Sequence, residues 1–243
     1  MISARREKFE KKFGRVGVLN LYLEDVLPDN SWKRKPCFIV GGGPSLSGFD
    51  FRKLRGERTI GINLAFRDFC PMIAFSMDRR FFLWVRSHKY GKDVTDRFID
   101  FPNYRVWLNT KPSVYSYPEL IYTVPVYESY SAGHWAFPFS MSDGLGHGNN
   151  SGYAALNLAV CLGANPIYLL GFDMKHSENE DGSKKTHYHD GHPKEQQTRE
   201  VESYPQYFER IAPILLKKRV RVINLNPDSA LSCFPKQTAE EVL

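Results

Sequence analysis

The sequence lacks the features that mark membrane-spanning, secreted or disulfide-stapled proteins. It contains no apolar run of transmembrane length, and its N-terminus, which reads Met-Ile-Ser-Ala-Arg-Arg-Glu-Lys, has no hydrophobic signal segment. Only 4 cysteines occur in 243 residues, and none forms a C-x-x-C pair. We therefore expect free thiols, no transmembrane segment and a cytoplasmic location.

The sequence also lacks arginine tracts with interleaved aromatic residues, so we expect no nucleic-acid partner. The formal net charge of +6 is moderate and fits a small anionic ligand. The basic stretch from Arg5 to Phe13 places Phe9 and Phe13 four residues apart, which is typical of a short amphipathic helix. Such a helix is either a solvated surface helix or a peripheral contact with a membrane or a partner.

Three consecutive glycines follow a short β-prone run, Cys37–Val40. Glycine lets a backbone approach a ligand closely, and a proline suits the first turn of a helix. The pattern predicts a buried strand, a tight turn and a helix whose N-terminal amides face an anion such as a phosphate. A tight turn without a ligand is the alternative. The residues of this turn are Gly41, Gly42, Gly43, Pro44 and Ser45.

Two common phosphate motifs are missing from this turn. A P-loop needs Gly-Lys-Ser/Thr after its first glycine, and the turn contains no such triplet. A dinucleotide fingerprint needs a third glycine where Leu46 stands, and an acidic residue where the run Thr59–Ile62 ends in Asn63. Nicotinamide and flavin dinucleotides are therefore not expected.

Strand-like and helix-like segments alternate along the rest of the chain, which predicts one α/β domain with a mostly parallel sheet and helices on both faces. We place this domain at residues 36–243 and treat residues 1–35 as a peripheral segment. Helical patterns are expected from Arg79, over Gly152–Leu162 and over Lys194–Lys218, with a short helix ending at Leu54. Strands are expected at Thr59–Ile62, Met72–Ser76, Tyr104–Trp107, Ile121–Val124, Pro166–Leu170 and Val220–Leu225.

Small polar residues follow several of these strands, at the sheet edge where α/β proteins bind ligands. Asp78 could accept ribose hydroxyls, hold a metal or cap the helix that follows it. Asn150 or Ser151 is a natural N-cap for the helix from Gly152. Asp173 ends a further strand in the same way.

The segment 174–192 is expected to form a mobile polar lid over this edge. Its second half carries closely spaced imidazoles and a carboxylate, which could hold Zn²⁺. These residues are His187, His189, Asp190 and His192.

Several short motifs occur together along the chain. They are Gly41-Gly42-Gly43-Pro44-Ser45-Leu46, Asn63, Asn150-Ser151-Gly152-Tyr153, Tyr168-Leu169-Leu170-Gly171-Phe172-Asp173, His187-Tyr188 with Gly191-His192, and Asn226-Pro227-Asp228-Ser229. Their order resembles that of the bacterial lipooligosaccharide sialyltransferases. The early motif is also similar to that of the MptE-like superfamily, which includes motility-accessory glycosyltransferases and an archaeal hydroxymethylpterin pyrophosphokinase.

This resemblance implies a single Rossmann-like domain of the GT-A-variant type that transfers a sugar from a CMP-linked, sialic-acid-like donor. The acceptor would be a glycan or another hydroxyl compound, no cofactor would be required, and the chain could be a homo-oligomer. The nucleotide would be held by the glycine turn, Asn63, Asp78, Asn150 to Gly152, and Asp173. His192 would be the general base, with Tyr188 near the phosphate.

The sequence departs from the family pattern where the donor phosphate is bound. Gly42 stands where the family has asparagine, and Gly148 where it has arginine, although His147 is adjacent. Lys175 replaces a tyrosine just after Asp173. His147 and Lys175 are therefore candidate phosphate contacts.

Two other functions fit the same residues. In a phosphotransferase or pyrophosphotransferase of the pterin-enzyme type, Asp78 and Asp173 would hold Mg²⁺. A protein that has kept the fold but lost catalysis would bind the nucleotide alone.

Overall fold

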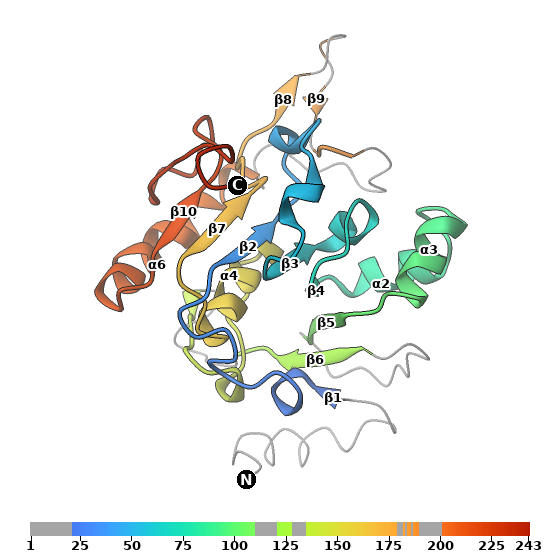
Figure 1. Cartoon of the computed structure of the whole chain (residues 1–243), viewed down its shortest axis with the longest axis horizontal. Helices are drawn as coiled ribbons and strands as arrows, with labels where there is room; N and C mark the ends of the chain where they lie inside the picture. The colour runs from blue at the N-terminus through green and yellow to red at the C-terminus, as the bar shows by residue number, and fades with distance from the viewer. Residues whose placement is uncertain are drawn as a thin grey trace.

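The computed structural model describes residues 21–109, 121–127, 135–178, 182, 184–185, 187–189 and 201–243. Its centre is an eight-stranded sheet with the order β1-β6-β5-β4-β3-β2-β7-β10, in which all neighbours are parallel (Figure 1). The strands are β1 Leu21–Tyr22, β2 Cys37–Val40, β3 Thr59–Ile62, β4 Ile73–Ser76, β5 Tyr104–Asn109, β6 Tyr122–Pro125, β7 Ile167–Leu170 and β10 Val222–Asn224. The expected parallel α/β fold is confirmed.

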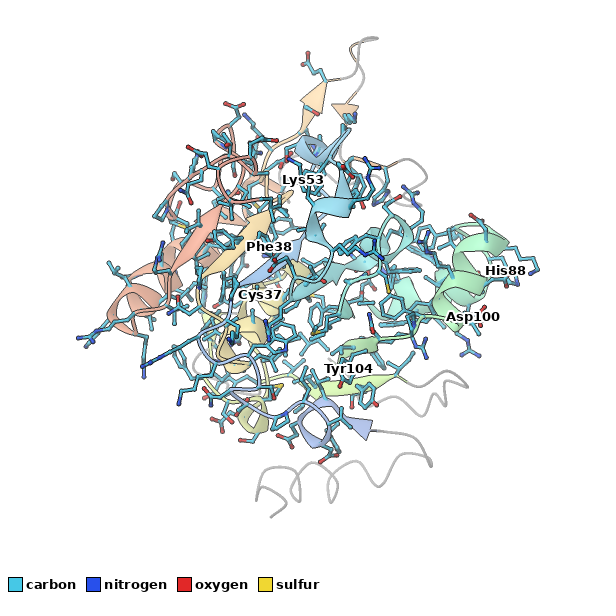
Figure 2. All side chains as sticks on the ribbon, in the orientation of Figure 1. Cys37, Phe38, Lys53, His88, Asp100 and Tyr104 are labelled. Atoms are coloured by element: carbon cyan, nitrogen blue, oxygen red, sulfur yellow. The ribbon has the colours of Figure 1, made fainter. Side chains whose placement is uncertain are left out.

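The strands have continuous apolar sequences because both faces of the sheet are covered. On β2, which Figure 2 marks by Cys37 and Phe38, successive side chains enter different cores. One face is covered by α4 (Ser151–Cys161) and α6 (Pro205–Lys217). On the other face, α2 (Arg79–Arg86) and α3 (Lys92–Ile99) pack over β4 and β5.

Helix α4 is the central helix of the domain and is buried on almost all sides, so its sequence is apolar around the whole circumference. Asn150 caps its N-terminus, and Gly163 follows its C-terminus with a φ of 78°, as the sequence predicted. Within the helix expected over Lys194–Lys218, residues 201–202 are helical and, after a short break, α6 begins at Pro205. Residues 194–200 lie outside the described part of the chain.

The helix expected directly after the glycine turn is a three-residue 3-10 helix, η2 (Pro44–Leu46). Two further 3-10 helices, η3 (Phe51–Leu54) and η4 (Asn63–Arg67), follow β2 and β3. Aromatic side chains from these short segments cover this part of the sheet, including Phe51 and Phe69, whose rings stack 5.3 Å apart. The expectation of a helix with a substantial dipole at this turn was therefore wrong.

The described part of the N-terminal segment belongs to the domain. Residues 21–22 form β1, which pairs in parallel with β6, and Leu23 and Trp32 are buried. The Trp32 amide donates to the carbonyl of Leu162 over 2.7 Å. Residues 21–35, which were expected to be peripheral, therefore belong to the domain, and residues 1–20 lie outside the described range.

The chain order creates a switch point between β2 and β7. From β2 the chain builds outward through β3, β4 and β5 to β6, and then returns to place β7 on the other side of β2. Open α/β sheets bind ligands in the crevice outside the carboxyl ends of the strands at such a switch point.

A small hairpin projects beyond this edge of the sheet (Figure 1). It consists of β8 (Ser177–Glu178) and β9 (Lys184–Lys185), which pair antiparallel within the expected lid segment. Within the described ranges, no helix combines the length and the apolar character needed to cross a membrane.

Candidate functional site

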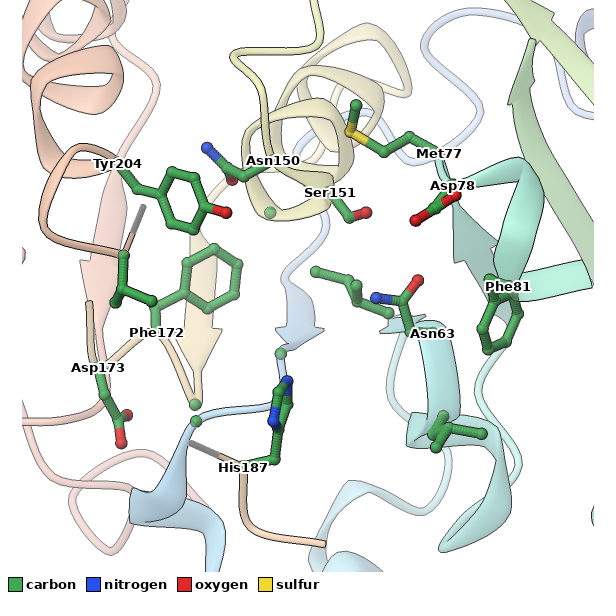
Figure 3. Close-up of a pocket in the computed structure, with 18 of the residues that line it drawn as sticks. Asn63, Met77, Asp78, Phe81, Asn150, Ser151, Phe172, Asp173, His187 and Tyr204 are labelled. Atoms are coloured by element: carbon green, nitrogen blue, oxygen red, sulfur yellow. The ribbon is translucent and has the colours of Figure 1, made fainter. Parts of the chain in front are cut away.

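A cavity of about 710 Å³ opens at the carboxyl ends of β2, β3, β4 and β7, beside the N-terminus of α4 (Figure 3). It lies at the switch point of the sheet and brings together residues from distant parts of the sequence. The sequence-predicted residues that line it are Gly41, Gly42, Gly43, Pro44, Asn63, Asp78, Asn150, Ser151, Gly152, Asp173 and Lys175, together with the lid residues His187 and His189. Ser45, Tyr188 and His147 are not among its lining residues.

Hydrogen bonds join the glycine turn after β2 to the end of β7 and the residues that follow it. The amides of Gly41 and Gly43 donate to the carbonyls of Leu170 and Gly171 over 2.8 and 3.0 Å. The Ser45 amide donates to one carboxylate oxygen of Asp173 over 2.8 Å, and the Ser45 hydroxyl donates to the other over 2.5 Å. The sequence predicts that the amides of this turn face a bound anion. Those of Gly41, Gly43 and Ser45 are instead already paired with protein acceptors.

Close packing of two chain segments explains the glycine at position 43. A Cβ atom on Gly43 would lie 2.5 Å from Asp173 Oδ1 and 2.6 Å from the carbonyl oxygen of Gly171. The turn after β2 and the turn after β7 thus approach each other too closely for any side chain at this position.

Asp173 joins these two turns. Its carboxylate is buried and also accepts a bond from Asn226 Nδ2 over 2.9 Å, so both oxygens have protein donors. Figure 3 shows this carboxylate pointing away from the centre of the cavity. Asp173 therefore serves as an internal acceptor in the described structure.

Asp78, the other carboxylate proposed for Mg²⁺, caps helix α2. Its side chain accepts from the Arg80 amide over 2.8 Å and forms an ion pair with the Arg80 guanidinium over 3.0 Å. Asp78 and Asp173 lie on opposite sides of the cavity in Figure 3. Among the residues that the structure describes, no group of three or more His, Cys, Asp or Glu side chains is arranged to hold a metal ion.

The turn before α4 leaves two neighbouring amides unpaired, whereas in the turn after β2 the Gly41, Gly43 and Ser45 amides are paired and that of Gly42 has no acceptor in the described structure. The cap residue Asn150 accepts from the Tyr153 amide over 2.8 Å and donates to the Gly148 carbonyl over 2.9 Å. In the described structure the amides of Ser151 and Gly152 have no acceptor, and both residues line the cavity. The positive end of an 11-residue α-helix therefore faces the cavity with free N–H groups.

Packing fixes this second turn and explains one departure from the family pattern. Gly148 and Asn149 have left-handed φ values of 50° and 54°. A Cβ atom on Gly148 would lie 2.4 Å from Tyr153 Cγ, so an arginine could not replace it in this conformation. Asn149 Nδ2 donates to the Tyr207 hydroxyl over 2.7 Å. His147 accepts from the Asn149 amide over 3.2 Å and helps to shape the turn.

Asn63 adds a side-chain donor to the same cavity. Its φ of 51° is unusual for a residue with a side chain but is tolerated by asparagine. Its Oδ1 atom accepts from the Ser76 hydroxyl over 2.8 Å, and Figure 3 shows its amide nitrogen directed toward the middle of the cavity. Asn63 therefore presents N–H groups where the free amides of α4 also point.

Residues 187–189 cross the glycine turn. A Cβ atom on Gly42 would lie 3.0 Å from the ring of His187, so this imidazole fills the space next to the glycine. The rings of His187 and His189 stack 5.2 Å apart. Asp190 and His192, including the proposed general base, lie outside the described residues.

Tyr188 points away from the cavity. Its amide donates to the Gly42 carbonyl over 3.0 Å, and its hydroxyl donates to Asp68 over 2.8 Å. Burial, reinforced by this bond to Asp68, raises the pKa of Tyr188 well above its usual range. The structure therefore does not place Tyr188 beside a phosphate in the cavity, contrary to expectation.

The sequence did not identify the aromatic end of the cavity. The cavity is lined there by Phe81, Trp84, Tyr90 and Trp107. Their spacing along the chain is that of ordinary core residues of a helix or strand, so it did not point to a site. Burial and the nearby charge of Asp78 raise the pKa of Tyr90 to about 12, so its hydroxyl stays protonated at neutral pH. Met77, His176 and Tyr204 also line the cavity and were not predicted.

Comparison with solved structures gives two similar folds. The MAf glycosyltransferase from Magnetospirillum magneticum AMB-1 superposes with a TM-score of 0.57 at 14% sequence identity, covering 94% of this chain and 37% of that chain. The sialyltransferase CST-II, solved with a trisaccharide acceptor and CMP, gives a TM-score of 0.47 at 16% identity, covering 84% of this chain and 86% of that one. No family model and no curated protein matches the sequence.

The likeness to the MAf glycosyltransferase confirms the expected Rossmann-like fold. The present chain spans 37% of the length of that protein, which is little more than a third.

Proposed function

We propose that this protein is a glycosyltransferase that uses a CMP-linked, sialic-acid-like sugar as donor and His192 as general base on the acceptor hydroxyl. The observation that carries the proposal is the set of N–H donors around the switch-point cavity. These are the free amides of Ser151 and Gly152 and the side-chain amide of Asn63. Among the described lining residues, the carboxylates of Asp78 and Asp173 already accept from protein donors, and free N–H groups favour an anionic ligand such as a nucleotide phosphate.

The reaction needs charge stabilisation at the phosphate and proton removal at the acceptor. The bond between the anomeric carbon and the phosphate oxygen breaks, and its electron pair stays on the phosphate. The acceptor oxygen forms the new bond to the anomeric carbon and loses its proton to the base. Amides fixed at the α4 N-terminus would stabilise the growing negative charge without reorganisation. An imidazole with an unperturbed pKa near ~6.5 suits the base, which typically contributes about 10²–10⁴-fold to the rate.

The cavity has the dimensions of a small-molecule site. Its volume of about 710 Å³ lies within the range of roughly 300–1,000 Å³ that is usual for small-molecule sites. The end at β2, β7 and α4 is rich in polar groups, whereas the end at α2 and β5 is aromatic. We assign the nucleotide to the polar end and the acceptor to the aromatic end, where a sugar ring can pack its apolar face.

A thermal-shift series tests the donor class. CMP, CMP-sugars, UDP-sugars, GDP-sugars and ATP are compared with EDTA and with Mg²⁺. A ligand at a hundred times its dissociation constant adds about 2.7 kcal/mol, which is readily measured. We expect CMP and a CMP-sugar to stabilise the protein in EDTA. Stabilisation by ATP in Mg²⁺ alone would support the phosphotransferase reading, and no shift with any nucleotide would contradict both.

Replacement of the base tests catalysis. His192→Ala should abolish transfer to an acceptor and leave CMP affinity unchanged, because the imidazole acts on the acceptor. His88→Ala is the matched control, since His88 lies outside the cavity and bonds to Thr95. Unchanged turnover in His192→Ala would refute the assigned role. Hydrolysis of the donor by the wild type without acceptor would distinguish an enzyme from a protein that only binds the nucleotide.

A further inference from the structure

His176 lines the cavity and is not used in the mechanism above. It follows β7 closely, on the loop that leaves the switch point. Both of its ring nitrogens are shielded from solvent, and neither has a hydrogen-bond partner in the described structure. Buried polar side chains nearly always have a partner, so an imidazole with two unpaired nitrogens requires an explanation.

An unpaired imidazole lowers the stability of the protein without ligand. A bound ligand that pairs with it would account for its presence in the cavity. His88, on the connection between α2 and α3, shows the ordinary arrangement. Its Nδ1 atom lies 3.0 Å from the Thr95 hydroxyl, and Figure 2 shows it at the outer edge of the molecule. His176 has the same chemistry and lines the cavity, but its shielded ring nitrogens have no such partner in the described structure.

The chemistry of the cavity indicates what the ligand offers to His176. The free groups around it are donors, namely the Ser151 and Gly152 amides, the Asn63 amide and the Lys175 ammonium. The carboxylates are already occupied, because Asp173 accepts from Ser45 and Asn226. Asp78 likewise accepts from Arg80. A set of donors of this kind receives the oxygens of a phosphate.

We propose that His176 is a contact residue for the donor phosphate, in the cavity that the N-terminus of α4 also lines. This inference rests on the proposed function. When the bond from the anomeric carbon to the phosphate oxygen breaks, the electron pair moves onto that oxygen. The His176 N–H donates a hydrogen bond to the phosphate, and this bond strengthens as the charge grows. The acceptor proton goes to the separate base, so His176 neither gains nor loses a proton in the step.

Two variants separate this role from a structural one. His176→Phe keeps a ring of similar shape and removes the unpaired nitrogens, so we expect its melting temperature to equal or exceed that of the wild type. We expect its CMP affinity to fall about tenfold and its kcat about a hundredfold, because the hydrogen bond strengthens in the transition state. His176→Gln restores a donor and should recover part of both losses. His88→Phe is the matched control and should leave affinity and kcat unchanged.

Imidazole ¹⁵N spectra give a direct readout. The signals of His176 are identified by their loss in His176→Phe, and CMP is then added to the wild type. We expect CMP to shift a His176 nitrogen and to leave the His88 nitrogens in place. CMP binding without a shift at His176, or variants that melt earlier but bind and turn over normally, would overturn this inference and leave the proposed function intact. Absence of any nucleotide binding would instead overturn the proposed function and this inference with it.

Discussion

Two turns at the same edge of the sheet carry the sequence signals of a phosphate site, and the structure gives them different tasks. The turn after β2 has three glycines, but the amides of Gly41, Gly43 and Ser45 donate to β7, to its following turn and to Asp173, and only the Gly42 amide of residues 41–45 has no acceptor in the described structure. The turn before α4 has a less conspicuous sequence, yet the Ser151 and Gly152 amides remain without acceptors in the described structure. The first turn joins two parts of the fold, and the second presents its amides to the cavity.

The difference shows that a glycine-rich turn is not by itself evidence for an anion site. What decides is whether the amides have acceptors within the protein. At the first turn a carboxylate of the protein already bonds to the amide and hydroxyl of Ser45, in the way that a bound anion would. A second negative group at that position would be repelled.

The largest effect is expected from Asp173→Asn, which tests the structural task of the first turn. The variant removes the charge and replaces one carboxylate oxygen by an NH₂ group, so at least one of the donors on Ser45 and Asn226 loses its acceptor. We expect the free energy of unfolding, measured with urea, to fall by about 3 kcal/mol. Asp78→Asn, at a more exposed helix cap, should lose no more than about 1 kcal/mol.

The contradicting result would be an Asp173→Asn variant that keeps its stability and loses CMP binding. That result would make Asp173 a ligand contact and would remove the distinction between the two turns.

A change at the ligand-facing side should act on affinity instead. Asn63→Asp keeps the acceptor for the Ser76 hydroxyl and replaces the NH₂ group in the cavity by a negative charge. We expect CMP affinity, measured by calorimetry, to fall by about 2–3 kcal/mol, or roughly 30–150-fold. Asn103→Asp adds the same charge outside the cavity and should leave affinity within about twofold. Equal losses of CMP affinity in both variants would show that the effect comes from the net charge of the protein and not from a contact at Asn63.

A third variant tests whether Tyr188, which contacts the glycine turn, stabilises the fold and does not bind the ligand. Tyr188→Phe removes the bond to Asp68, so we expect a loss of about 1 kcal/mol of stability at pH 8 and unchanged CMP affinity. Because the pKa of Tyr188 is raised in the folded state, its stabilising contribution is complete below pH ~10 and is lost as the pH rises above that value. Urea unfolding at pH 8 and pH 10.5 should therefore show a smaller alkaline loss in Tyr188→Phe. A large loss of CMP affinity would return Tyr188 to the phosphate site.

The smallest effect is expected from Ser151→Ala. The proposed contact uses the backbone amide of Ser151, which the substitution keeps, so CMP affinity should change by less than about threefold. A loss of tenfold or more in calorimetry would show that the hydroxyl, and not the amide, binds the ligand.

Much of the fold could be predicted because it follows from local sequence. Buried parallel strands such as β2 and β3 are continuous apolar runs, and α4 carries both its cap, Asn150, and its stop, Gly163. The edge strand β1 was missed because two residues carry no periodic pattern. The helix after Gly43 was misjudged because a proline and a serine after glycine suit a 3-10 turn as well as an α-helix.

The candidate site was predicted only in part, because its decisive contacts are long-range. Ser45 and Asp173 are 128 positions apart, and no local pattern indicates that the carboxylate takes the amide. Trp84 and His176 reach the cavity through the packing of α2 and the path of the β7 loop. Asn63 and Ser151, which the sequence predicts as nucleotide-binding residues, both line the cavity, and both stand at recognisable boundaries of a strand or a helix.

A crystal structure of the protein with CMP tests the central claim most directly. We expect the phosphate oxygens to lie within hydrogen-bond distance of the Ser151 and Gly152 amides, and the bonds between Ser45 and Asp173 to remain intact. A phosphate held by the amides of residues 42–45, with Asp173 displaced, would contradict it.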